Sequence, residues 1–364
     1  KQAGSFTGGA LLTGSSGIAS LKIKPSKTIK GLIDINPKPA FKVSPLLYMQ
    51  FMEPLGSTEP SVEGSWDYRK DDWREDFVTC VKDLAPDMIR WGGIYNRYYK
   101  WREGIGPIGN RPSVYNHHWG GKETNRVGTH EIMDFCKRVG AKPIMGVNFE
   151  SDGFEYYKNT IQGENRFGTD EEAANWVSYC NDPKHKERAK NGHSSPFGAE
   201  YWQLGNESSY GGKDGFSQET YIEAMRRFAA KMRERDASIK LIGWGDVPNN
   251  GKVRPGESQE GNEPWASTVL KQGAEYMDYI AFHMMGVYPR WKDSVIRGFD
   301  YLNDPAKAWA ELIEMGDIPE FRVNIFREEL HKANSDAGLA ITEGHLSLSP
   351  YNTNAILRSW LSVA

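Results

Sequence analysis

Two glutamates, each directly after a short apolar stretch, are the residues of this chain best suited to chemistry. Glu207 ends the stretch Tyr-Trp-Gln-Leu-Gly-Asn-Glu, and Glu343 ends Gly-Leu-Ala-Ile-Thr-Glu. Cleavage of a glycosidic bond uses two carboxyl groups, which stand ~5–5.5 Å apart in retaining enzymes and ~6.5–9.5 Å apart in inverting enzymes. We therefore interpret Glu207 and Glu343 as a candidate pair of catalytic carboxyl groups.

Four further polar residues follow or end predicted strands. Asn206, next to the first glutamate, is placed to hydrogen-bond the hydroxyl beside the reacting carbon. Arg90 is a natural cation for keeping the second glutamate ionised, although a purely structural ion pair stays open. Glu53 would be a costly buried carboxylate unless it binds hydroxyls or pairs with a cation. His283 ends another apolar strand, where a core histidine with satisfied hydrogen bonds is the alternative.

The elements that must position these residues alternate between strand and helix from Pro45 onward, which predicts a parallel α/β fold. We predict strands at Leu47–Phe51, Met88–Trp91, Pro143–Val147, Tyr201–Leu204, Leu241–Gly243, Tyr279–Phe282 and Leu339–Thr342. The predicted helices are Trp73–Leu84, Thr129–Val139, Asp170–Tyr179, Ser217–Arg235, Trp265–Gln272, Pro305–Met315, Ile325–Ala333 and Asn354–Val363. Because barrel strands end at one rim, both glutamates should reach a common site.

Seven predicted strands leave a (β/α)8 TIM barrel one strand short, with an open edge. We therefore expect a barrel over residues 44–364 that is incomplete in this chain. Residues 1–43 form a separate N-terminal segment, flexible at first and then with one or two strands within Leu21–Ile35. The Gly/Asn/Pro-rich stretch Asp246–Pro264 is predicted to be a mobile loop at the strand ends.

The composition excludes several classes of partner. The net charge is −3 and the isoelectric point is about 6.3, so neither suggests binding to nucleic acid. No apolar run reaches the ~18 residues of a membrane span. Aromatic residues make up 12% of the chain, a fraction compatible with a carbohydrate site. The N-terminus has no signal pattern, so a secreted, periplasmic or cytoplasmic location stays open.

The cysteines and glycine pairs give no sign of a metal or phosphate site. Three cysteines without metal-like spacing predict neither a disulfide nor a zinc site, and we expect Cys80 and Cys136 to be buried thiols. Gly92-Gly93 and Gly120-Gly121 lack the spacing of phosphate-binding loops. His117, His118 and Glu123 give no convincing metal motif.

The chain resembles glycoside hydrolase family 51, the α-L-arabinofuranosidases of a large clan of retaining barrel enzymes. The matching stretches are Ser44–Tyr48, Phe51–Glu53, Arg90–Gly93, Trp101–Pro107 with Arg111-Pro112, Thr124–Glu131, Glu171–Trp176, Tyr179–Asn181 and Gly205–Glu207. The resemblance extends from about Ser44 to Glu343, most of the chain.

This resemblance implies that Glu207 is the acid/base and Glu343 the nucleophile. It also implies that Glu53 and Asn206 contact furanose hydroxyls and that His283 lines the site. The expected partner is a carbohydrate substrate, without cofactor or metal; self-association stays open. Similar proteins carry a C-terminal β-sandwich that includes the N-terminal strand.

Several positions depart from the family pattern. The family has an Asn after its two glycines, where this chain has Ile94; Asn96 is the nearest substitute. Met285 stands where a Tyr contacts the nucleophile, and Tyr288 is the candidate to replace it. Gly344-His345 follows the nucleophile in place of a Trp, and Gly153–Thr169 is longer than the family's loop.

These departures affect the substrate more than the reaction. We expect a retaining glycosidase that removes α-L-arabinofuranosyl groups from plant-type polysaccharides or oligosaccharides. A related retaining enzyme, such as a galactofuranosidase or an endo-glucanase, is one alternative. A barrel that binds carbohydrate without catalysis is the other.

Overall fold

The computed structural model describes residues 38–39, 42–57, 62–246, 265–287, 294–296, 300–316 and 318–347. The chain divides into two compact units, Lys1–Val43 and Ser44–Ala364, and nearly all described residues belong to the second. Several predicted features lie outside the described residues: the strands within Leu21–Ile35, the helix Asn354–Val363, Tyr288 and all but the first residue of the loop Asp246–Pro264.

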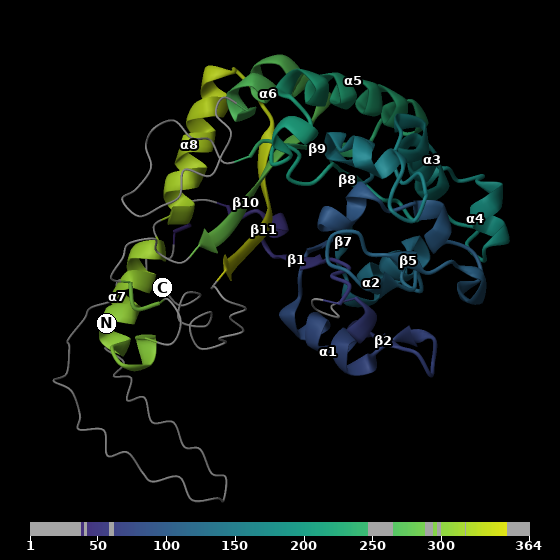
Figure 1. The fold of residues 1–364 in the computed structure, drawn as a ribbon, viewed down its shortest axis with the longest axis horizontal. Helices are drawn as coiled ribbons and strands as arrows, with labels where there is room; N and C mark the ends of the chain where they lie inside the picture. The colour runs from purple at the N-terminus through teal and green to yellow at the C-terminus, as the bar shows by residue number, and fades with distance from the viewer. Residues whose placement is uncertain are drawn as a thin grey trace, which may run out of the picture. The chain divides into compact units, whose positions relative to one another are not determined.

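A seven-stranded sheet forms the centre of the second unit (Figure 1). Every strand pairs in parallel with its neighbours, in the order β1-β4-β7-β8-β9-β10-β11. The strands are β1 (Met49–Met52), β4 (Met88–Trp91), β7 (Lys142–Val147), β8 (Tyr201–Leu204), β9 (Lys240–Trp244), β10 (Tyr279–Val287) and β11 (Gly338–Ser347). This topology confirms the predicted α/β class and a barrel-like sheet with seven strands among the described residues.

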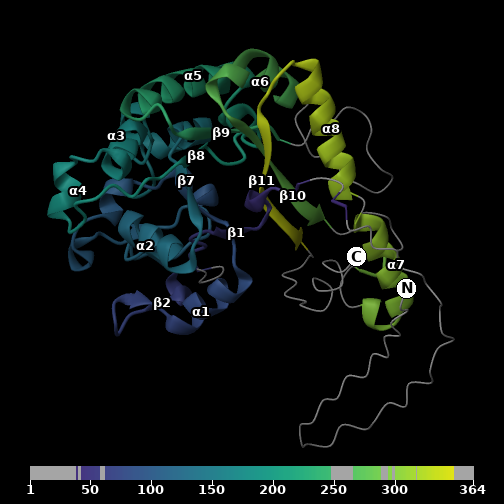
Figure 2. The ribbon, with the colours of Figure 1, turned by 180° about the vertical axis from the view of Figure 1, so that it is seen from behind.

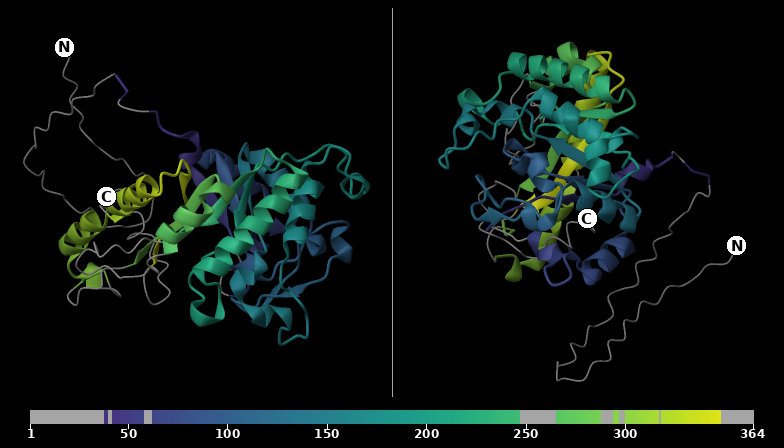
Figure 3. Two further views of the ribbon diagram at one scale, coloured as in Figure 1. Left: turned by 90° about the horizontal axis from the view of Figure 1, so that it is seen from above. Right: turned by 90° about the vertical axis from the view of Figure 1, so that its right-hand side faces the viewer.

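Helices follow most of the strands. They are α1 (Glu75–Leu84), α2 (Thr129–Val139), α3 (Asp170–Asn181), α4 (Lys186–Lys190), α5 (Gln218–Arg235), α6 (Trp265–Gly273), α7 (Pro305–Gly316) and α8 (Ile318–Lys332). Helix α5 packs against α3 and α6, and the three lie together in each view (Figures 2 and 3). No helix within the described ranges is both long enough and apolar enough to span a bilayer.

Short elements complete the described part of the chain. Two antiparallel hairpins pair β2 (Trp66–Asp67) with β3 (Asp72–Trp73) and β5 (Val114–Tyr115) with β6 (Lys122–Glu123). The 3-10 turns are Pro45–Leu47, Glu63–Ser65, Gly93–Arg97, Trp101–Gly104, Ile108–Asn110, Glu150–Gly153, Glu155–Lys158, Gly212–Asp214, Ala274–Tyr276 and Asp300–Leu302.

Strand β8 shows how the sheet separates core from site. Successive side chains of a strand point to opposite faces. Trp202 therefore packs outward, against Trp176 of α3 at 5.4 Å between ring centroids. Gln203 points the other way and accepts a hydrogen bond from Arg90 of β4. All four residues of β8 are buried, as expected for a parallel strand covered on both faces.

Three sequence predictions need correction. Helix α8 begins at Ile318, seven residues before the predicted Ile325, because Pro319 lies in the first turn, where a helix tolerates proline. Strands β10 and β11 extend beyond Phe282 and Thr342. Cys80 is exposed, whereas Cys136 is buried as predicted. On α1 the buried residues are Val78 and Val81, and Cys80 lies off that apolar stripe.

Helix α5 begins with the predicted Ser217 cap. The Ser217 hydroxyl accepts a hydrogen bond from the Thr220 amide, and the Thr220 hydroxyl accepts one from the Ser217 amide. Replacing this cap (Ser217→Ala) should lower the free energy of unfolding by about 1 kcal/mol. Urea unfolding measures the loss, with Gln218→Ala in the same turn as the control. Equal stability of Ser217→Ala and the wild type would contradict the prediction.

Candidate active site

Arg90 organises the candidate site from inside the barrel. Its side chain is fully buried, and its guanidinium donates hydrogen bonds to Gln203 (2.7 Å), Glu343 (2.7 Å) and Asn206 (2.5 Å). These partners belong to β8, the loop after β8, and β11. Arg90 lies on the second strand of the sheet and Glu343 on the last, so their ion pair requires the sheet to curve round on itself.

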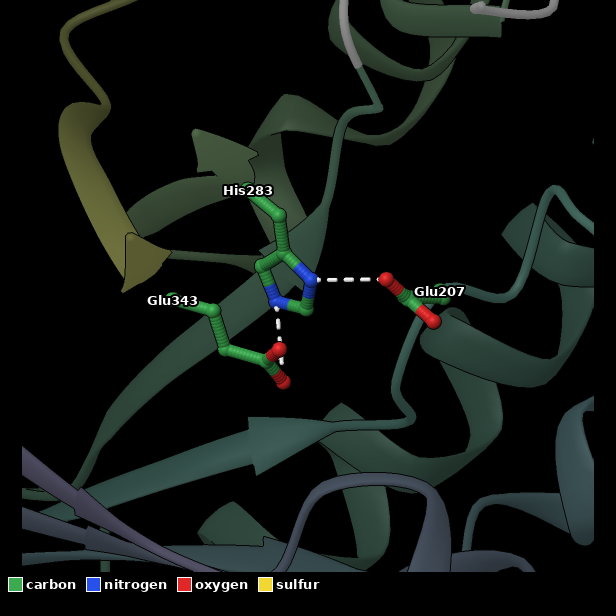
Figure 4. A group of neighbouring side chains, drawn as sticks. All are labelled: Glu207, His283 and Glu343. Atoms are coloured by element: carbon green, nitrogen blue, oxygen red, sulfur yellow. Dashed lines mark hydrogen bonds and ion pairs between the residues drawn. The ribbon is translucent and has the colours of Figure 1, made fainter. Parts of the chain in front are cut away.

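Glu207 and Glu343 lie on either side of His283 (Figure 4). Nδ1 of His283 lies 2.9 Å from Oε1 of Glu207, and Nε2 lies 3.5 Å from Oε1 of Glu343. Nε2 also lies 3.1 Å from the hydroxyl of Thr342. One polar atom of each of the three side chains lies within 4.8 Å of the other two. A carboxyl oxygen of Glu207 and one of Glu343 are therefore no more than 4.8 Å apart.

A bulge in β11 aligns Glu343 with His283. Strands β10 and β11 pair Phe282 with Ile341, but the next pair is His283 with Glu343, so Thr342 is an extra residue in β11. A bulge of this kind re-aims the side chains that follow it. Without the extra residue the register would place Thr342, not Glu343, opposite His283.

Glu207 is held in a left-handed backbone conformation with φ of 53°. A buried ion pair between Asp152 and Arg97 (2.8 Å) supports the turn that contains it. Asp152 accepts hydrogen bonds from the Asn206 amide (3.1 Å) and from the Ser208 hydroxyl (2.7 Å). Arg97 donates to the carbonyl of Asn206 at 3.1 Å. The backbone of Asn206, before Glu207, and the side chain of Ser208, after it, are therefore held by buried charged groups.

Glu53 directly follows β1, and its carboxyl group packs against the backbone of Gly93 and Ile94. Its carboxyl accepts a hydrogen bond from the Ile94 amide at 2.7 Å. A Cβ at Gly93, where φ is +80°, would lie 2.5 Å from the carboxyl carbon of Glu53, so only glycine fits there. Burial, and then the charge of Glu343, raise the pKa of Glu53 to about 7, although Arg90 opposes the shift.

Two buried amides have atoms without a hydrogen-bond partner within the described part of the chain. Nδ2 of Asn206 is one, while Oδ1 of the same side chain is bound by Arg90. The other is Asn96, whose Nδ2 and Oδ1 both lack a partner. Asn96 packs against the backbones of Gly92 and Gly146, so it occupies space inside the barrel beside β7. A buried unpaired donor such as Asn206 Nδ2 is costly unless a ligand satisfies it.

The geometric cluster of Glu207, His283 and Glu343 also resembles a set of metal ligands. Two carboxylates and an imidazole suit several divalent cations. However, the Glu343 oxygen nearest His283 is also the one bound by the Arg90 guanidinium. The Arg90 guanidinium thus already binds the Glu343 oxygen that would coordinate a metal. This contact favours hydrogen-bonding and catalytic roles for the three residues.

The structure brings together six of the seven predicted site residues: Glu53, Arg90, Asn206, Glu207 and His283 lie around Glu343. Tyr288 lies outside the described residues, as does the side chain of Met285. That Tyr288 takes the place of the family's tyrosine, at whose position Met285 stands, therefore stays a prediction.

Sequence reasoning missed the residues that support the site. Asp152 and Arg97 are 55 positions apart, so nothing local in the sequence indicates that they pair. Trp119, whose indole N–H donates to Glu53 at 3.5 Å, gave only the general signal of an aromatic residue in a Gly-rich loop. The register shift at Thr342 had no signal at all, because the stretch reads as one uninterrupted strand.

Comparisons with known proteins agree with this geometry. Residues 80–302 match the family model described as the α-L-arabinofuranosidase 1 domain. An intracellular exo-α-(1→5)-L-arabinofuranosidase of Halalkalibacterium halodurans is 31% identical over 262 residues, 67% of this chain and 46% of that protein. An intracellular exo-α-L-arabinofuranosidase of Bacteroides ovatus is 30% identical over 65% of this chain and 43% of that protein. The chain thus spans less than half the length of these two relatives.

Solved structures share the fold. The family 51 arabinofuranosidase from Xanthomonas axonopodis pv. citri superposes with a TM-score of 0.69 at 23% identity, covering 88% of this chain and 61% of that one. The α-L-arabinofuranosidase from Thermotoga maritima, solved as an arabinose complex, gives 0.64 at 23% identity, covering 82% and 55%.

A parallel barrel whose strand ends bring two glutamates together is the architecture of the barrel glycosidases. The family match extends over more than half of the chain. The chain therefore belongs to the α-L-arabinofuranosidase family, and the resemblance to glycoside hydrolase family 51 is confirmed.

The raised pKa of Glu53 predicts a pH-dependent stability. Its ordinary pKa is 4.5, and in the fold it is about 7. The folded state favours the protonated acid, so the contribution of Glu53 to the free energy of unfolding is greatest below about pH 4.5. It should fall by about 3 kcal/mol as the pH rises to about 7.

Glu53→Gln, which imitates the protonated acid, should remove this decline. Urea unfolding of the wild type and the variant across that pH range measures the difference, with Glu223→Gln on the exposed face of α5 as the control. Parallel stability curves for the wild type and Glu53→Gln would contradict the prediction.

Proposed function

We propose that this chain carries the catalytic barrel of an exo-acting α-L-arabinofuranosidase that hydrolyses its substrate with retention of configuration. The observation that carries the proposal is the approach of a Glu207 oxygen and a Glu343 oxygen within 4.8 Å. This separation supports the retaining arrangement of ~5–5.5 Å better than the inverting one of ~6.5–9.5 Å. The names of the relatives support the sugar and the exo action.

In the first step, a Glu343 oxygen attacks the anomeric carbon while Glu207 gives its proton to the leaving oxygen. The bond to the leaving group breaks, and a glycosyl ester forms on Glu343. Arg90 holds the attacking carboxylate through a 2.7 Å contact, and His283 holds the acid through a 2.9 Å contact. Each reacting group thus has a partner that fixes its direction.

In the second step, Glu207 takes a proton from water as the water attacks the anomeric carbon from the side that the leaving group left. The ester bond breaks, Glu343 is released, and arabinose leaves with its original configuration. The unpaired Nδ2 of Asn206 is placed to donate to the sugar hydroxyl beside the reacting carbon. Glu53, whose pKa is raised to about 7, offers a donor to further hydroxyls when it is protonated and an acceptor in either state.

Variants at the two glutamates should give different products with azide. In Glu343→Ala, azide enters the space of the lost carboxylate and attacks the substrate directly, so the product is the β-arabinofuranosyl azide. In Glu207→Ala, a 4-nitrophenyl substrate still forms the ester, since its leaving group needs little protonation. Azide then attacks that ester and gives the α-azide.

Without azide, Glu343→Ala should lose at least about a hundredfold in kcat/KM on 4-nitrophenyl α-L-arabinofuranoside. Glu207→Ala should instead lose about a hundredfold in kcat, because its ester still forms but lacks the base that activates water. Proton NMR of the azide products distinguishes the two anomers, with Glu223→Ala as a control of unchanged activity. Wild-type turnover by Glu343→Ala, or the same anomer from both variants, would refute the assignment of roles.

A further inference from the structure

The segment Gly153–Thr169, which the sequence predicts to be longer than the corresponding family loop, contributes to an aromatic cluster that the proposed chemistry does not use. The tyrosine cluster, as we name it, has His117 at its centre and four tyrosines around it: Tyr98, Tyr115, Tyr156 and Tyr157. The ring centroids of these tyrosines lie 5.1 to 6.3 Å from that of His117. Tyr98 and Tyr157 also stack on each other at 5.6 Å.

Two rings of the tyrosine cluster are exposed, two are buried, and that of His117 is half-buried. Tyr156 is 46% exposed and Tyr115 37%, whereas Tyr98 and Tyr157 are buried. Burial lowers the pKa of His117, which keeps the imidazole neutral at neutral pH. The charged neighbours Glu155 and Lys158 pair with each other at 2.6 Å. The exposed part of the cluster is therefore aromatic and carries phenol groups. The charges of Glu155 and Lys158 beside it are paired with each other.

The segment that carries Tyr156 and Tyr157 is firmly anchored. The Arg166 amide donates to the Tyr157 carbonyl at 2.7 Å, which closes the segment on itself. The Arg166 guanidinium donates a hydrogen bond to the Glu103 carboxylate at 2.6 Å. The backbone carbonyl of Arg166 accepts one from the side-chain amide of Asn148 at 2.8 Å. Lys100 donates to the carbonyl of Phe167 at 2.7 Å. A surface held in this way loses little conformational freedom when it binds a ligand.

Contacts through Phe154 and Arg97 link the segment that carries Tyr156 and Tyr157 to the residue before the proposed acid/base. Phe154 lies under the Arg97 guanidinium at 4.9 Å, and Arg97 donates to the carbonyl of Asn206, directly before Glu207. On the other side, the chain passes from His117 to His118. Burial, and then the charge of Arg97, lower the pKa of His118, and the charge of Glu207 opposes that shift. The acid/base is the group that protonates the leaving oxygen, so the cluster lies toward the leaving group rather than toward the arabinosyl group.

We propose that Tyr115 and Tyr156 bind the sugar units of the leaving group, so that the segment Gly153–Thr169 sets a preference for oligomeric or polymeric substrates. This inference rests on the proposed function and names the substrate class of the same site. Apolar C–H faces of sugar rings pack on aromatic rings, while hydroxyls reach the phenol groups at the rim. Two sources share this chemistry: an arabinan chain and an arabinose-substituted xylan chain.

The test compares long and short leaving groups. The substrates are α-1,5-linked arabinotetraose, an arabinofuranosyl-substituted xylotetraose and methyl α-L-arabinofuranoside, whose leaving group is methanol. In Tyr115→Ala/Tyr156→Ala, the ratio of kcat/KM for an oligosaccharide to kcat/KM for the methyl glycoside should fall roughly tenfold. The oligosaccharide that shows the loss identifies the source.

Two further variants sharpen the comparison. Tyr156→Trp keeps a ring and should retain the ratio. Tyr68→Ala removes a ring that is 50% exposed on the β2–β3 hairpin and should leave it unchanged. A ratio within twofold of wild type for both oligosaccharides in the double variant would overturn the inference. An equal fall on all three substrates would also overturn it, because the rings would then support the catalytic geometry instead.

Failure of the proposed function is recognised separately. If the wild-type chain hydrolyses none of the three substrates, that function is wrong in this chain. Calorimetry with the same two oligosaccharides then decides the inference by itself. A roughly tenfold weaker Kd in the double variant supports the surface, and an unchanged Kd, or no binding by the wild type, refutes it.

Discussion

A buried cation in the middle of the barrel determines how the rest of this structure is arranged. A fully buried guanidinium is unfavourable unless hydrogen bonds and an opposite charge compensate its lost hydration. Arg90 obtains that compensation from Gln203, Asn206 and Glu343, which come from different strands and loops. The strands must therefore meet round this side chain, and the same contacts direct one glutamate and the residue before the other into a shared space.

The acids around Arg90 hold more negative charge than one guanidinium can balance. Burial, and then the charge of Glu343, raise the pKa of Glu53, and the charge of Arg90 offsets only part of that shift. His283 lies between the carboxyl groups of Glu207 and Glu343. Whether Glu53 holds a proton therefore depends on the charge of Glu343 as well as on its own burial.

Much of this arrangement was predictable, and the remainder depends on contacts that leave no local pattern. The strands Met88–Trp91 and Tyr201–Leu204 were predicted with correct limits, because short apolar runs between turn residues are typical of buried parallel strands. Glutamates after such strands indicated the pair. The Asp152–Arg97 support and the extra residue Thr342 were not predictable, since each depends on a partner far along the chain.

The backbone of Glu207 has a consequence for how this protein can change. A left-handed conformation in a residue other than glycine costs about 1 kcal/mol or more, and asparagine or glycine adopts it more easily. Variants that relax this strain would resist heating better while they lose their acid. A search for heat-resistant descendants that ignored turnover would therefore enrich inert ones, and only selection on the reaction itself would preserve the strained residue.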